Sequence, residues 1–222
     1  MTERVLVVAA HADDETLGCG GTIARHARQG DSIDVVFVAD GVTGRGDTVL
    51  TDRHAAALKA CSILGTNAPV FFDFPDQKLD TLSFLQVVQA IEPVIERVQP
   101  TVIYTHHGGD LNLDHRIVHQ AVMTALRPMP SSSYKAIYAF EVASSTEWAS
   151  SAIGEAFRPD HFVGIETTLE LKIEALHAYS REMRDFPHSR SYEALRALAI
   201  LRGASVGLPA AEGFITLRSL LR

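Results

Sequence analysis

The sequence predicts an α/β fold: a Rossmann-like, doubly wound and mostly parallel sheet with helices on both faces. Short, continuously apolar runs rich in β-branched residues, such as residues 5–10, are typical of central parallel strands that are buried on both faces. These runs alternate with segments of helical spacing, and the connections between them are short. The 222 residues, 46% of them hydrophobic, suffice for one core, so we expect a single domain over residues 1–222.

The predicted elements follow one another in a regular order. We expect strands at residues 5–10, 33–39, 70–74, 102–105, 134–142 and 162–165, the last two as candidates for an added sheet edge. We expect helices at residues 23–29, 51–64, 83–98, from Asp114 onward, 169–179 and 192–201. Gly30 and Gly65 are typical of residues that follow a helix end. The polar segment 181–190 is equally consistent with a lid and with an ordinary solvated connection.

Composition argues against several partners. Lys and Arg number 20 against 27 for Asp and Glu, and no basic stripe is apparent, so neither nucleic acid nor an anionic membrane surface is an expected partner. Cys19 and Cys61 are too few for a disulfide framework and are expected as buried thiols. No signal segment and no apolar run of membrane-spanning length is present, which predicts a soluble, cytoplasmic protein. The oligomeric state stays open, and a homo-oligomer is possible.

A polar cluster follows the first predicted strand. His11, Asp13, Asp14 and Glu15 lie between this strand and a glycine-rich turn at residues 18–21. In open α/β sheets, ligands bind beyond the carboxyl ends of the strands. One imidazole and three carboxylates within five residues suggest a divalent metal, although the acids could instead cap a helix that begins near Thr16. Dinucleotide binding is a weaker alternative, because the glycine spacing departs from the fingerprint and the acids would oppose a pyrophosphate.

A second polar cluster follows the strand predicted at residues 102–105. It comprises His106, His107, Asp110, Asn112, Asp114 and His115. Parallel strands bring both clusters to one edge of the sheet, where His115 can meet His11 and Asp14. The loop at residues 40–46 reaches the same edge and could line the site or serve as a flexible connector. The coincidence of the two clusters is the strongest argument for a functional site.

The two clusters together predict hydrolysis. Two histidines and one carboxylate leave an exchangeable position on zinc, as a catalytic site requires. His11, Asp14 and His115 supply that set for one Zn²⁺ per chain, and other divalent ions are also compatible. We expect zinc-activated water to attack an amide or ester carbonyl, with Asp13 as the general base. Asp114 or Asp110 could orient a histidine, while His106, His107 or Asp13 could protonate the leaving amine.

The motif at residues 11–15, followed by residues 17–22 and later by Asp114 and His115, resembles the PIG-L or LmbE-like family of zinc-dependent N-deacetylases. The resemblance extends over most of the chain, and it implies a deacetylase domain whose substrate is a small N-acetylglucosamine-type amino sugar or glycoconjugate. It implies His11, Asp14 and His115 as zinc ligands and Asp13 as the base. The candidate catalytic residues are Asp13, Asn112 and Asp114. Candidate substrate contacts are Arg53, Asp40, Gly41, His106, His107 and Asp110.

Two positions depart from the family pattern. Ala12 replaces a common proline, which loosens the turn without removing a ligand. Asn112 stands where many members have a histidine that stabilises the oxyanion or protonates the leaving group. Asparagine can donate a hydrogen bond to an oxyanion, but it cannot shuttle a proton. The alternative to a deacetylase is therefore a non-catalytic or altered-specificity protein that binds a sugar or metabolite and retains the metal site.

Overall fold

A seven-stranded sheet in the order β3-β2-β1-β4-β5-β7-β6 forms the centre of the molecule. The structure is a computed structural model, and it describes residues 2–43 and 50–221. The parallel strands are β1 (Arg4–Ala9), β2 (Ser32–Ala39), β3 (Val70–Phe74), β4 (Val102–His106) and β5 (Ala136–Phe140). β7 (Ala211–Ser219) runs antiparallel between β5 and β6 (His161–Gly164). The predicted α/β class and mostly parallel sheet are confirmed.

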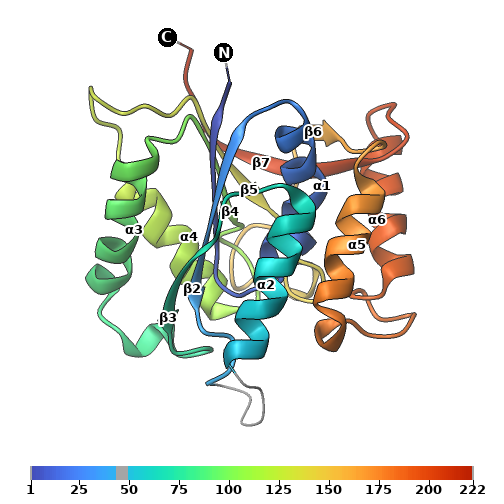
Figure 1. Cartoon of the computed structure of the whole chain (residues 1–222), viewed down its shortest axis with the longest axis horizontal. Coiled ribbons are helices and arrows are strands. Elements are labelled where there is room, and N and C mark those ends of the chain that lie inside the picture. The colour runs from blue at the N-terminus through green and yellow to red at the C-terminus, as the bar shows by residue number, and fades with distance from the viewer. Residues whose placement is uncertain (1, 44–49, 222) are drawn as a thin grey trace.

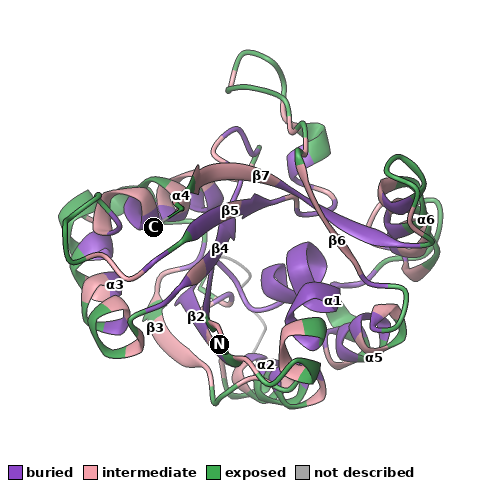
Figure 2. Cartoon of the chain, turned by 90° about the horizontal axis from the view of Figure 1, so that it is seen from above, coloured by how far each residue is buried: buried purple, intermediate pink, exposed green. Residues whose placement is uncertain are grey.

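Helices cover both faces of the sheet, as Figures 1 and 2 show. Val5, Val7 and Ala9 of β1 belong to the core cluster shared with α1 (Asp14–Arg28), α2 (Leu50–Leu64) and α5 (Leu169–Ala178). The alternate β1 residues, Leu6 and Val8, pack in the cluster of α3 (Phe84–Val98) and α4 (Leu113–Ala125). α6 (Tyr192–Ala204) contacts β7 and β6. β1 is thus covered on both sides, as its continuous apolar run predicts.

Three short 3₁₀ turns complete the described elements: η1 (Leu79–Thr81), η2 (Thr146–Trp148) and η3 (Ser180–Glu182). The two chain ends lie together at one end of the molecule in Figure 1, and the five parallel strands run toward the opposite end. That opposite end is where the polar clusters emerge. No helix in residues 2–43 and 50–221 is long and apolar enough to cross a membrane.

Three details of the predicted elements were wrong. The first helix begins at Asp14 instead of Ile23, with a break in helical geometry at Cys19 (φ −144°). Of the two strands expected at an added sheet edge, β6 lies at an edge, whereas β5 lies inside the sheet between β4 and β7. The sequence did not predict β7, because Glu212 and Gly213 interrupt its apolar pattern. Glu212 is nevertheless buried, because the Lys172 ammonium lies 2.6 Å from its carboxylate.

The glycines predicted as a turn lie in α1, where they allow other parts of the chain to pack closely against this helix. A Cβ atom on Gly21 would lie 2.8 Å from the side chain of Ile165, and one on Gly18 would overlap the ring of Phe140. These contacts explain the glycines without a nucleotide.

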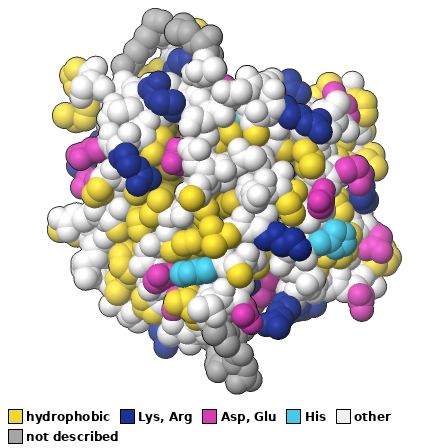
Figure 3. Space-filling model, viewed as in Figure 1, with side chains coloured by type: hydrophobic (Ala, Val, Ile, Leu, Met, Phe, Trp, Pro, Cys, Tyr) yellow, Lys and Arg dark blue, Asp and Glu magenta, His cyan; other side chains and the backbone are white. Residues whose placement is uncertain are grey.

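Cys19 and Cys61 are both free and buried, as predicted. On the face in Figure 3, cationic and acidic side chains are interspersed, without one continuous basic patch.

Candidate metal centre

Three side chains from the two polar clusters meet beyond the carboxyl ends of β1 and β4. His11 and Asp14 come from the turn after β1, and His115 comes from the first turn of α4. One possible ligand atom from each residue lies within 4.8 Å of the other two. Nδ1 of His11 and Nε2 of His115 each lie 3.2 Å from Oδ2 of Asp14. The structure brings these residues together as the sequence predicts, and their role as ligands stays a prediction.

The polar atoms of this set fit a bound cation. Oδ1 of Asp14 and Nε2 of His115 are buried, and neither makes a hydrogen bond within the described part of the chain. Buried polar atoms without partners are rare, because losing water without a replacement is unfavourable. Two imidazoles and one carboxylate are also a donor set that zinc binds in catalytic sites. The residues present therefore fit a divalent metal ion.

Carboxylates lie behind both histidines. Oδ1 of Asp110 is 3.1 Å from Nδ1 of His115, and Asp110 itself accepts hydrogen bonds from the hydroxyls of Ser145 and Thr146. Asp76 and Asp114 each place one oxygen 3.1 Å from Nε2 of His11. Such partners fix the orientation of ligand rings. His11, Asp76 and Asp114 also satisfy the distances of a metal set, but they use the His11 nitrogen opposite to the one that faces Asp14.

The electrostatics of the cluster favour positive charge. Burial would lower the pKa of both histidines, but the surrounding carboxylates raise the pKa of His11 well above its usual value and that of His115 to about 9. Burial would likewise raise the pKa of Asp14, yet His115 and His11 hold it well below the ordinary value. The cluster thus stabilises cations, either as protons on the histidines or as a metal ion in their place.

Asp13 lies beside this set in an unusual backbone conformation. Its φ of 134° is positive, and its side chain makes no capping hydrogen bond to α1. The alternative in which the acids merely cap a helix is therefore wrong for Asp13. Its Oδ2 instead accepts a hydrogen bond of 3.0 Å from Arg190. Burial raises the pKa of Asp13 while Arg190 and Arg53 oppose the rise, and strained residues of this kind concentrate at functional sites.

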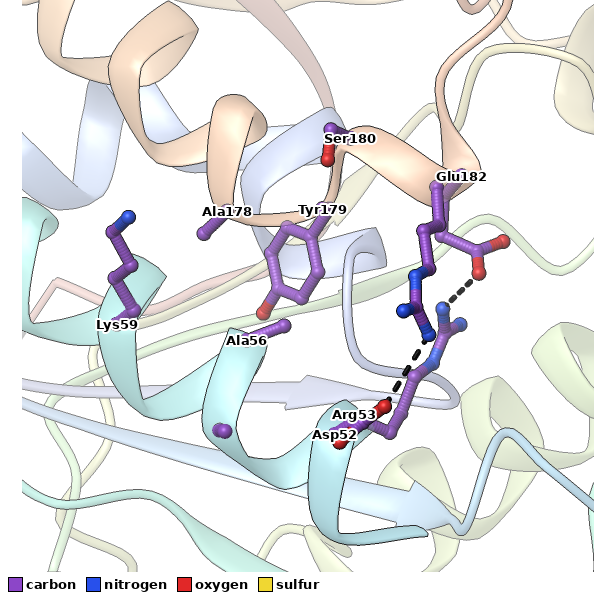
Figure 4. A pocket seen from close by; sticks show the side chains of 10 residues that line it. Asp52, Arg53, Ala56, Lys59, Ala178, Tyr179, Ser180 and Glu182 are labelled. Atoms are coloured by element: carbon purple, nitrogen blue, oxygen red, sulfur yellow. Dashed lines mark hydrogen bonds and ion pairs between the residues drawn. The ribbon is translucent and has the colours of Figure 1, made fainter. Parts of the chain in front are cut away.

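Arg53 forms a buried ion pair with Glu182 that connects α2 to the segment after α5. Figure 4 shows the two side chains pointing toward each other at one end of a cavity that extends along α2 past Tyr179 to Lys59. This cavity has a volume of about 400 Å³. The predicted contact of Arg53 with substrate stays a prediction. In the structure, the guanidinium of Arg53 is paired with the carboxylate of Glu182.

His106, His107 and Asp110 make contacts inside the protein, and their predicted roles stay predictions. His106 is fully buried beneath His115, and its Nε2 accepts a 2.8 Å hydrogen bond from the backbone of Ala10. Burial, reinforced by His115, also lowers its pKa well below the usual value. Nε2 of His107 lies 2.8 Å from the carbonyl oxygen of Glu155. These two rings and Asp110 face into the protein, so their positions do not support substrate contact or proton donation.

The remaining predicted residues hold loops in place. Asn112 caps α4, because its Oδ1 accepts a 2.9 Å hydrogen bond from the backbone of Asp114. Asp114, predicted as catalytic, accepts hydrogen bonds from the backbone of Gln77 (2.8 Å) and Leu79 (3.2 Å) and orients His11. The half-buried Asp40 accepts hydrogen bonds from backbone N–H groups of its own loop and of Asp76. Gly41 packs against Arg53, and residues 44–46 of the predicted loop lie outside the described residues.

Sequence reasoning missed three residues at the site. Arg190 contacts Asp13, Asp76 contacts His11, and the side-chain nitrogen of Gln77 lies 3.4 Å from His11. Arg190 belongs to the polar segment 181–190, whose sequence is equally consistent with a lid and with a solvated connection. Asp76 and Gln77 belong to the Asp- and Pro-rich loop after β3. The polarity of these two segments is the one sequence feature that could have pointed to these residues, since the residues that they contact are distant in sequence.

The fold and site define an α/β protein with a buried His–Asp–His group that is able to bind a metal ion, at the carboxyl edge of its parallel strands. The family model described as PIG-L: GlcNAc-PI de-N-acetylase matches residues 6–126, which is more than half of the chain. The chain therefore belongs to the PIG-L family.

Individual relatives span most of the chain. A probable N-acetyl-alpha-D-glucosaminyl L-malate deacetylase 2 from Bacillus cereus is 30% identical over 81% of this chain and 83% of its own length. A 4-oxalmesaconate hydratase from Pseudomonas putida is 28% identical over 96% of this chain and 86% of its own length. The structure of N,N'-diacetylchitobiose deacetylase from Pyrococcus horikoshii matches with a TM-score of 0.77 at 20% identity, covering 96% of this chain and 83% of that one. That structural match supports the fold.

Proposed function

We propose that this protein is a metal-dependent hydrolase that removes an N-acetyl group from an amino sugar or glycoconjugate of the N-acetylglucosamine type. Residues 1–222 form the catalytic domain, with one Zn²⁺ per chain. The observation that carries the proposal is the incompletely paired set of His11, Asp14 and His115 beside the buried carboxylate of Asp13. Membership of the PIG-L family and the deacetylase relative from Bacillus cereus support an acetamide as the bond that is cleaved.

His11, Asp14 and His115 would hold the ion, which when bound acidifies a water molecule and polarises the amide carbonyl. Asp13 accepts the proton of the attacking water, and the Arg190 hydrogen bond keeps its carboxylate in position. The same proton can then pass from Asp13 to the leaving amine, since His106 and His107 face into the protein. The Asn112 amide nitrogen can donate to the oxyanion, because capping uses only Oδ1.

Acetate release tests this proposal. Metal-stripped protein is incubated with a panel of N-acetylated amino sugars before and after one equivalent of zinc, with His115→Ala as the control that lacks a ligand. We expect acetate only from the zinc-loaded wild-type protein. Tightly bound zinc without acetate from any substrate would contradict the proposal and favour a binding protein or another acyl substrate.

A second candidate is a hydratase. The specific observation is the 4-oxalmesaconate hydratase from Pseudomonas putida, which aligns with nearly the whole chain. Water activation at a cation site with Asp13 as base would serve hydration as well as hydrolysis. Incubation with 4-oxalmesaconate separates the two candidates, because hydration adds water to that compound and releases no acetate.

A further inference from the structure

A second cavity shares a wall with the proposed active site. It has a volume of about 350 Å³ and is lined by Ser144, Glu182, Arg184, His188 and Arg190. Arg190 connects it to the reaction centre, because its Nη1 donates to Asp13 and its Nε donates to the carbonyl oxygen of Ala143 (3.2 Å). Glu182 also lines the cavity of Figure 4 and so separates the two. A group bound here would therefore lie next to a substrate that reacts at Asp13.

The charges in this lining are predominantly positive. Glu182 is the one carboxylate among the lining residues, and it forms an ion pair with Arg53. The guanidinium of Arg190 forms an ion pair with the carboxylate of Asp13. Arg184 has no carboxylate within 4.0 Å in the described part of the chain, so its charge is not neutralised by an ion pair.

The guanidinium of Arg184 is also held in place. Its Nη1 donates to the backbone carbonyl oxygens of Arg181 (3.0 Å) and Met183 (2.8 Å). These bonds orient the group and leave its other N–H donors for a ligand. A planar guanidinium with several parallel donors suits a carboxylate or a phosphate.

His188 and Ser144 add further hydrogen-bonding side chains to the lining. Nδ1 of His188 accepts a 3.0 Å hydrogen bond from the backbone of Arg190, so the hydrogen of the neutral ring lies on Nε2. The ring of Trp148 meets the His188 ring edge-on, with centroids 5.5 Å apart. The lining therefore combines two guanidinium groups with a hydroxyl and an imidazole.

We infer that this cavity is a subsite for an anionic group, a carboxylate or a phosphate, on the part of the substrate that is attached to the amino sugar. The inference rests on the proposed function, which supplies the amino sugar, and on Arg184, whose positive charge calls for an anionic group. It deepens the proposed function by naming the chemistry of the attached group, with Arg184 as the residue that selects for it.

The test compares ligands that differ only in charge. The carboxymethyl glycoside of N-acetylglucosamine is matched with its neutral carboxamide, and N-acetylglucosamine 1-phosphate is included to distinguish phosphate from carboxylate. The variants are Arg184→Gln, which removes the charge, and Arg184→Lys, which keeps it. Arg181→Gln is the matched control, because Arg181 is an exposed arginine of the same segment that pairs with Asp52 and does not line this cavity.

We expect the wild-type protein to prefer an anionic substrate over the neutral one by about tenfold to a hundredfold in kcat/KM. Arg184→Gln should abolish most of this preference, mainly through KM. Arg184→Lys should retain part of it, and Arg181→Gln should retain all of it. Equal turnover of charged and neutral substrates by the wild-type protein, or an unchanged preference in Arg184→Gln, would overturn the subsite while leaving deacetylation established.

Binding of the free-amine products tests the anionic subsite even when the protein releases no acetate. Titration calorimetry with the carboxymethyl and carboxamide glycosides of glucosamine, and with glucosamine 1-phosphate, requires no turnover. At least tenfold tighter binding of one anionic product, lost in Arg184→Gln and kept in Arg181→Gln, supports the subsite independently of the deacetylase activity. Indistinguishable binding of all three products, or no binding of any, rejects it.

Discussion

Two of the buried polar clusters in the described part of the chain differ in how completely their atoms are paired. In the first, the Lys172 ammonium lies 2.6 Å from Glu212 and donates to the carbonyl oxygen of Leu17, while Glu212 also accepts hydrogen bonds from the backbone of Gly21 and Thr22. This network joins α1, α5 and β7. In the second, the candidate metal centre, buried atoms of Asp14 and His115 have no hydrogen-bond partner among the described residues.

The comparison separates structural polar groups from those that fit a ligand. A buried charge is tolerated when its hydrogen bonds are satisfied, as in the Lys172–Glu212 pair. In the candidate metal centre, by contrast, Oδ1 of Asp14 and both ring nitrogens of His115 make no hydrogen bond within the described part of the chain, although carboxylate oxygens lie 3.2 Å and 3.1 Å from those nitrogens. We therefore expect substitutions in the first cluster to affect folding and substitutions in the second to affect metal binding and turnover.

The largest expected effect is on turnover, in Asp13→Asn. This variant keeps the size of the side chain and removes the proton acceptor, so kcat should fall by about 10²- to 10⁴-fold. Zinc content, measured by elemental analysis, should be unchanged, because Asp13 is not among the three predicted ligands. Activity within tenfold of wild type would remove Asp13 from the role of general base.

Lys172→Met breaks the fully paired cluster. It leaves the Glu212 charge buried without its partner, so the free energy of unfolding in urea should fall by about 3–5 kcal/mol. Zinc stoichiometry should stay that of the wild type. Lys135→Met is the matched control, since it removes a more exposed pair with Glu3 and should cost less than about 1 kcal/mol. Equal losses in the two variants would invalidate the comparison between a buried and an exposed pair.

Added zinc should stabilise the protein through the candidate metal centre and not through the Lys172–Glu212 pair. Zinc at a hundredfold excess over its dissociation constant should stabilise the folded protein by about 3 kcal/mol, seen as a rise in Tm by calorimetry. The rise should persist in Lys172→Met and disappear in His115→Ala. A full rise in His115→Ala would place the bound zinc elsewhere.

The smallest effect is expected from packing beside the paired cluster. Gly21→Ala introduces a Cβ atom 2.8–2.9 Å from Ile165 without removing a hydrogen bond to Glu212, and overpacking of this kind costs about 1–3 kcal/mol. In the control Gly20→Ala, the nearest side-chain atom lies at 3.2 Å on Thr16, so the loss in urea unfolding should be smaller. The reverse order would show that contact with Ile165 is not what requires a glycine at residue 21.

Most of the fold was predictable because its signals are local. β3 lies at the predicted residues, and β2 and α2 each begin one residue earlier than predicted, since apolar runs and helical spacing are written within a few residues. β7 was missed because Glu212, the second residue of this strand, is a charged residue that is buried beside a partner 40 residues away. Distant pairing of this kind cannot be recognised from the pattern of one strand.

The sequence by itself determined the α/β class and the meeting of His11, Asp14 and His115, because parallel strands must end at a common edge. It could not determine which polar groups face the site and which support it. Only the tertiary structure placed Asp110 and Asp114 behind the histidines, turned His106 into the core, and brought Arg190 to Asp13 across 177 positions of the chain. The physical reason is that side-chain direction and the pairing of distant loops depend on how the layers pack, and that packing is a property of the whole molecule.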